Sequence, residues 1–206
     1  EILESNGELD FIQKFMKIRM VELNEESQKI KKQMSLLENT IHNLGKDTGR
    51  LKYAVVLKTI PGREVISLRK IIPSREEEGM LWGELDQEII KQKLSLSKDC
   101  HALAIYHDDE YKDIDIDVEI QTAINGAGKD SDHVKFLTTP ERKVVSVTFR
   151  GSYDQRPQVS KAIADWLEAS DYVMDGPMIN IFHVTPYETP EPQNWITEVC
   201  YTVTSK

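Results

Sequence analysis

The chain has 206 residues, a formal net charge of −9 and 39% hydrophobic residues. This length suits one or two domains, and the apolar content is sufficient for a core, which excludes a wholly disordered chain. Residues 1–50 hold 9 acids and 8 bases, a balance of −1, so the remainder carries −8 and is a poor binder of nucleic-acid phosphates.

Membrane and secretory signals are absent from the sequence. No apolar run approaches the roughly 18 residues of a membrane-spanning helix, and no signal peptide pattern is seen. Two cysteines, Cys100 and Cys200, are too few for a disulfide framework and predict reduced thiols in a cytoplasmic protein. Because the chain opens at Glu1 directly into helix-like sequence, we expect a fragment with a segment removed before it.

Residues 1–46 predict a coiled-coil dimerisation helix. Apolar residues recur at alternating spacings of four and three, interrupted only by the polar residues Gln13 and Ser27. The apolar positions of this seam are Leu9, Met16, Met20, Leu23, Ile30, Met34, Leu37, Ile41 and Leu44. Such a helix would be roughly 54 Å long, more than one domain covers. We therefore expect a homodimer through residues 9–44, the alternative being that the seam packs on the rest of the same chain.

Residues 51–206 contain an internal repeat, with copies at approximately 51–125 and 133–204. The matching segments are Thr59–Leu68 with Thr138–Val147, Ile105–His107 with Ile181–His183, and Val118–Ile120 with Thr197–Val199. Each copy has the order strand, helix, strand, strand, which predicts an α+β fold with an antiparallel sheet and two pseudo-symmetric halves. Ligands tend to bind in a cleft where such halves meet.

Strand and helix positions follow from periodicity and turn residues. The predicted strands are 53–57 and 65–69, 102–107, 114–124, 144–149, 178–184 and 196–203, and the predicted helices are 76–93 and 159–169. Alternation assigns to the core face Ile114, Ile116, Val118, Ile120 and Ile124. We expect Ala104, Tyr106, Asn180 and Phe182 on the opposite face together with Glu119 and Glu198, a composition that suits an amphipathic and particularly a cationic ligand.

Two stretches resemble a known family. The pattern from Leu57 to Leu85, with Pro61 and Gly79-Met80-Leu81-Trp82-Gly83, resembles the GyrI-like effector-binding domain, as do Ile181–Val184, Pro186 and Thr197–Tyr201. A coiled-coil helix before such a domain is similar to MerR-family transcriptional regulators that sense drugs. The resemblance implies a small-molecule effector bound between the halves, and contact with DNA only through a domain missing from this chain.

The resemblance also implies site residues. Glu198 matches a glutamate of the last strand, and Tyr153 matches the aromatic residue of a Gly-x-Tyr motif. The candidate ligand-binding residues are Glu198, Tyr153, Tyr106, Phe182, Asn180, Trp82 and Glu119. A Glu-x-aromatic motif is common in the preceding strand, where this chain has Asn180-Ile181-Phe182, which favours a neutral or weakly polar ligand.

Other interpretations stay open at this point. The candidate aromatic residues also suit a core, and the carboxylates also suit a solvated strand face. No histidine or cysteine spacing predicts a metal site, and no cofactor motif is present. The main alternative to a sensor is a GyrI-like hydrolase with Glu198 as base or nucleophile and Tyr153 as proton donor. A third possibility is a module that binds only a protein partner.

Overall fold

The computed structural model describes residues 12–28, 30–31, 34, 53–97, 102–108 and 110–206. The chain divides into two compact units, Glu1–Lys52 and Tyr53–Lys206. Within the described segments, no helix has both the length and the apolar character that crossing a membrane requires.

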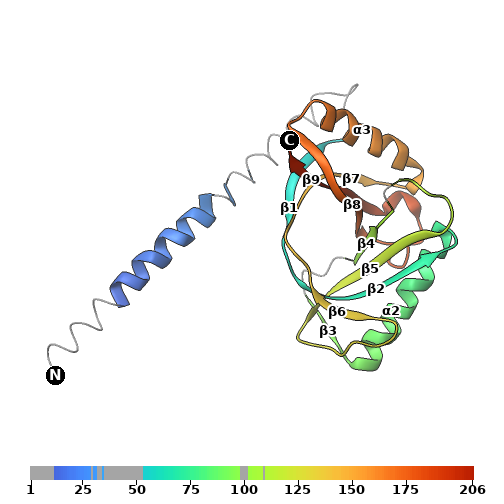
Figure 1. Cartoon of the computed structure of the whole chain (residues 1–206), viewed down its shortest axis with the longest axis horizontal. Coiled ribbons are helices and arrows are strands. Elements are labelled where there is room, and N and C mark those ends of the chain that lie inside the picture. The colour runs from blue at the N-terminus through green and yellow to red at the C-terminus, as the bar shows by residue number, and fades with distance from the viewer. Residues whose placement is uncertain (1–11, 29, 32–33, 35–52, 98–101, 109) are drawn as a thin grey trace. The chain divides into compact units, whose positions relative to one another are not determined.

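In the first unit, residues 12–28 form an α-helix, which is blue in Figure 1. Its seam residues are exposed, with Met16 62%, Met20 70% and Leu23 50% accessible. The helix therefore presents an apolar stripe that nothing in this unit's described residues covers. The seam positions Leu9, Leu37, Ile41 and Leu44 lie outside the described residues, so the predicted long helix is seen only in part and its pairing stays a prediction.

The second unit is a single antiparallel sheet with two α-helices among its described residues. Its elements are β1 (Val55–Ile60), β2 (Glu64–Ile72), η1 (Arg75–Glu77), α2 (Glu78–Gln92), β3 (Ser95–Leu96), β4 (Ala102–Tyr106), β5 (Ile116–Asn125), β6 (Lys135–Thr138), β7 (Arg142–Arg150), η2 (Tyr153–Gln155), α3 (Arg156–Glu168), β8 (Tyr172–Val184), η3 (Pro192–Asn194) and β9 (Ile196–Ser205). The strand order is β1-β7-β9-β8-β4-β5-β2-β6, with β3 beside β5.

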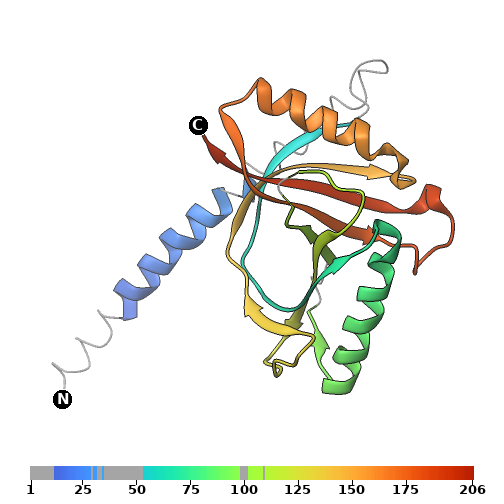
Figure 2. The same ribbon diagram turned by 45° about the vertical axis from the view of Figure 1, so that its right-hand side comes forward.

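This strand order forces the sheet to curl. β1 and β2 are six places apart in the order, which is about 29 Å in a flat sheet. The link of residues 61–63 between them spans at most about 14 Å. A hydrogen bond joins the β1–β2 link to the β6–β7 link and holds the curled sheet at this point: the amide of Thr139 donates to the carbonyl of Arg63 at 2.8 Å. Figures 1 and 2 show the resulting curl, with α2 and α3 outside it.

Both helices cover the same face of the sheet. α2 packs on β2 and β5 above a core that contains Leu68, Ile120 and Leu85, whereas α3 packs on β1 and β7 above Val147 and Ile163. Leu103, Ile105, Ile179, Ile181 and Cys200 form a third apolar cluster with Ile60 and Val144 on the other face. Since neither helix covers that face, the curl of the sheet itself buries it.

The predicted antiparallel α+β arrangement is confirmed, with differences at the ends of elements. Both helices begin in a 3-10 turn, and α3 starts at Arg156, three residues before the predicted start, since Pro157 is tolerated in a first turn. β8 begins at Tyr172, six residues early, and shifts its register between Met174 and Met178. The core assignment holds for Ile116, Val118, Ile120 and Ile124 but is wrong for Ile114, which is 69% exposed before β5 begins.

Candidate functional site

The predicted site residues fall on opposite faces of the sheet. Directly paired residues of neighbouring strands share a face, and Asn180 pairs with Val199 and with Ala104. Tyr106 pairs with Val118 of the core below α2. The prediction that Ala104, Tyr106, Asn180 and Phe182 share the carboxylate face is therefore wrong. Glu198 pairs with Ile181 and Glu119 with Ile105, on the inner face of the curl.

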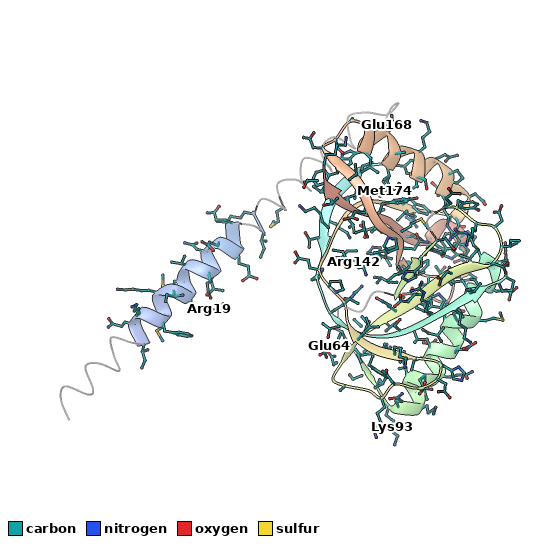
Figure 3. The ribbon with its side chains drawn as sticks, viewed as in Figure 1. Arg19, Glu64, Lys93, Arg142, Glu168 and Met174 are labelled. Carbon is teal, nitrogen blue, oxygen red and sulfur yellow. The ribbon has the colours of Figure 1, made fainter. Side chains whose placement is uncertain are left out.

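On the outer face, a polar and aromatic cluster lies over the central strands between α2 and α3. The two helices converge toward their first turns in Figures 1 and 2, and Figure 3 places Glu168 and Lys93 at the diverging ends. The inter-helix cluster comprises Arg75, Glu78, Trp82, Tyr106, Tyr153, Arg156, Asn180, Phe182 and Thr197. The sheet places four of these side chains, and the start of each helix places the other five.

Glu78 organises one half of the inter-helix cluster. Its Oε2 accepts the hydroxyl of Tyr106 at 2.6 Å, and its Oε1 accepts the indole N–H of Trp82 at 3.2 Å. The Nδ2 of Asn180 donates to the same tyrosine hydroxyl at 3.3 Å. Burial, followed by the nearby charge of Glu78, raises the pKa of Tyr106, so the phenol stays protonated. Both acceptor oxygens of Glu78 are thus occupied by groups of the protein.

Two guanidinium groups stack on the aromatic rings of the inter-helix cluster. The Cζ of Arg75 lies 4.5 Å from the ring centre of Tyr106, and the Cζ of Arg156 lies 4.4 Å from that of Tyr153. Trp82 meets Phe182 edge-on with ring centres 6.0 Å apart. Tyr153 also packs against Trp195 at 5.1 Å. Aromatic walls and cations therefore meet in one place.

Several buried polar atoms of this cluster lack a hydrogen-bond partner among the described residues. They are the Nε atoms of Arg75 and Arg156, the Oδ1 atom of Asn180 and the Oγ1 atom of Thr197. Asn180 is only 1% exposed, and an unmade hydrogen bond at a buried amide costs free energy of about 1–3 kcal/mol. Unsatisfied donors and acceptors gathered at one place call for a further partner, such as ordered water or a bound molecule.

The inner face carries a second arrangement, repeated in the two halves. His107 donates to the Oε2 of Glu119 at 2.7 Å and Ser67 donates to its Oε1 at 2.5 Å. In the second half the partners of Glu198 are His183, at 3.1 Å, and Ser146. We call these two sets the Ser–Glu–His networks. In each network the carboxylate lies between the other two groups, unlike a nucleophilic triad, in which the histidine is central.

Glu198 is held as an anion by its partners. The Nζ of Lys58 lies 2.6 Å from its Oε1. Burial opposes ionisation, but the hydrogen bonds of His183, Lys58 and Ser146 outweigh it and lower the pKa of Glu198 to about 2. Burial is likewise outweighed at Glu119, where His107, Ser67 and Gln121 lower the pKa to about 2. Partners within the fold thus already satisfy both carboxylates.

The structure therefore brings together five of the seven candidates and separates two. Trp82, Tyr106, Tyr153, Asn180 and Phe182 meet in the inter-helix cluster, whereas Glu119 and Glu198 lie on the inner face. The pair required for the hydrolase alternative, Glu198 and Tyr153, is thus divided by the sheet. The sequence interpretation missed Arg75, Glu78 and Arg156. The signal for them was their place at the starts of the two repeat-related helices.

Comparisons with known proteins agree with the fold. Residues 53–203 match the family described as a GyrI-like small molecule binding domain, and the chain belongs to this family. The C-terminal domain of EcmrR is 27% identical, with a TM-score of 0.71 over 76% of this chain and 100% of that one. EcmrR in a complex with DNA is 25% identical, with a TM-score of 0.72 over 93% of this chain and 72% of that one.

A more distant structure shares only the fold. A hydrolase encoded by lin2189 from Listeria innocua is 9% identical, with a TM-score of 0.53 over 73% of this chain and 91% of that one. No curated protein sequence matches the chain. The family match and the two EcmrR structures confirm the resemblance to the effector-binding part of a MerR-family regulator.

Proposed function

We propose that this chain senses a small amphipathic molecule for a transcriptional regulator and binds it at the inter-helix cluster. The observation that carries the proposal is the set of buried, unpartnered polar atoms on Arg75, Arg156 and Asn180, surrounded by aromatic side chains. A ligand that supplies these hydrogen bonds and packs on Trp82 or Tyr153 would stabilise the folded state. The family to which the chain belongs is one of small-molecule binding domains.

We further propose that the sensor acts as a homodimer through residues 9–44. The exposed stripe of Met16, Met20 and Leu23 supports this, because a coiled-coil partner would bury it. Ligand would then shift the balance between two dimer arrangements in proportion to its differential affinity for them. The similarity to EcmrR in its complex with DNA supports DNA as the final target. Because this chain is acidic, we propose that a segment outside it makes the contact with DNA.

A thermal-shift screen tests the site. Cationic, neutral and anionic amphipathic compounds are added to wild type, to Trp82→Ala and to Trp166→Ala. Trp166 is a matched control because it also lies on a helix but stacks on Tyr172, away from the cluster. We expect at least one compound to raise the melting temperature of wild type and Trp166→Ala but not of Trp82→Ala. If no compound stabilises wild type, the sensor proposal fails and a partner-binding module becomes the better account.

A further inference from the structure

The charges of the inter-helix cluster are unbalanced in favour of cations. Arg75 and Arg156 form no ion pair within the described segments of the chain, and both have a buried Nε without an acceptor. Glu78 is the acid in contact with the same rings, and its two oxygens already accept Tyr106 and Trp82. The site therefore holds two cations with unpaired Nε donors and one anion whose two oxygens each already accept a hydrogen bond from the protein.

The fold adds positive potential at the same place. α2 begins at Glu78 and α3 at Arg156. The amides of these two residues already donate to the carbonyls of Arg75 and Tyr153 in the preceding 3-10 turns, so the contribution here is the positive end of each helix dipole. Amide groups at the start of a helix favour negative charge. Asn180, buried at the base of the cluster, is uncharged, and its unpaired Oδ1 is an acceptor that needs a hydrogen-bond donor rather than a carboxylate.

The geometry of the guanidinium groups suits a planar oxyanion. Each group lies over a tyrosine ring and has an Nε–H without an acceptor among the described residues. A carboxylate accepts two parallel hydrogen bonds from the edge of a guanidinium group, and these charge-assisted bonds are stronger than neutral ones. Trp82, Tyr153 and Phe182 supply flat apolar surface beside it.

From this we infer that the effector is a planar aromatic acid, whose carboxylate meets Arg75 and Arg156 while its ring system packs against Trp82 and Tyr153. The inference rests on the proposed function and narrows the class of effector to acids. It is the opposite of the preference for cationic ligands that the carboxylates of the strands indicated in the sequence. Those carboxylates lie on the other face of the sheet and are already paired.

The test uses three probes with one ring system and different charge: 2-naphthoate, 2-naphthamide and 2-naphthylmethylammonium. Isothermal titration of the whole chain should give an affinity for the acid about tenfold higher than for the amide, and weaker binding still for the ammonium compound. Arg75→Gln and Arg156→Gln should each lower the affinity for the acid by about tenfold and change the affinity for the amide by less than about twofold. Lys129→Gln removes the same charge from an exposed position in the connector between the repeats, and it should change neither the affinity for the acid nor that for the amide.

The variants are checked for folding by their melting temperature. Arg156→Lys serves as a second variant, since it keeps the charge but loses the planar fork, and should bind the acid with intermediate affinity. Tighter binding of the ammonium probe, lost in Trp82→Ala, would overturn the inference while the sensor proposal stands. Binding of none of the three probes would also overturn the inference, and the sensor proposal would then be decided separately by the wider thermal-shift screen.

Discussion

Replacing Glu198 by glutamine should destabilise the domain substantially, because this carboxylate is a structural anion of the inner face. Glu198 is 4% exposed and pairs with the Nζ of Lys58 at 2.6 Å and with the Nε2 of His183 at 3.1 Å. Removing one partner of a buried ion pair costs about 3–5 kcal/mol. The side chain of Lys58 is 34% exposed and can regain water, so we expect a loss of about 2–3 kcal/mol in the free energy of unfolding.

Urea denaturation monitored by circular dichroism measures this loss. For a domain of this size the melting temperature should fall by about 5–10 °C. Lys58→Met alone should also destabilise, because it leaves the carboxylate without its ammonium partner. The double variant should recover part of the loss, which gives a coupling energy between the two residues. A loss below about 0.5 kcal/mol, combined with loss of ligand binding, would refute the structural role and return Glu198 to the ligand site.

Three further predictions follow from the same structure. Protonation of Glu119 and Glu198 should contribute to acid unfolding of the domain. Both have folded pKa values of about 2, below the ordinary value, so the stability that they contribute is present above about pH 4.5 and is lost as the pH falls toward 2. The slope of unfolding free energy against pH should therefore flatten when both residues are replaced by glutamine, and an unchanged slope would contradict the assignment. Gly62→Ala should lower the free energy of unfolding by about 1–3 kcal/mol, because the new Cβ would lie 2.6 Å from the carbonyl oxygen of Thr139. Gly83→Ala in α2 would meet no atom within 4 Å and should stabilise the domain by up to about 1 kcal/mol. Equal effects of the two substitutions in chemical denaturation would argue against the close contact at Gly62. Leu23→Glu should convert a dimer into a monomer in light scattering after gel filtration, while Lys14→Glu, outside the seam, should not; a wild-type monomer at micromolar concentration would count against the coiled coil.

Periodicity and the internal repeat were sufficient to predict the class of fold. The alternation of Val118 and Ile120 identifies a strand with one buried face, and the second copy of the motif identifies its counterpart. Local patterns also located both helices to within a few residues. These features depend on short-range spacing, so they can be read without knowing which strands are neighbours.

The faces of the site were harder to predict, for a physical reason. Alternation shows that Glu198 and Val199 point to opposite sides of one strand, but it does not show which of them shares a side with Asn180. That relation depends on the register between β8 and β9, which long-range pairing sets across the turn at 185–195. Arg75 and Arg156 were missed for a similar reason, since only the packing of the helix starts on the sheet brings them to Tyr106 and Tyr153.

The most direct test of the account is a binding measurement on three variants. The compound with the largest thermal shift is titrated calorimetrically into wild type, Trp82→Ala, Trp166→Ala and Glu198→Gln, each at a temperature where the variant is folded. We predict that Trp82→Ala weakens binding by at least about tenfold, since a buried aromatic contact is worth more than about 1.4 kcal/mol, while the other two variants stay within about threefold. Full binding by Trp82→Ala together with its loss in Glu198→Gln would place the ligand on the inner face and contradict the account.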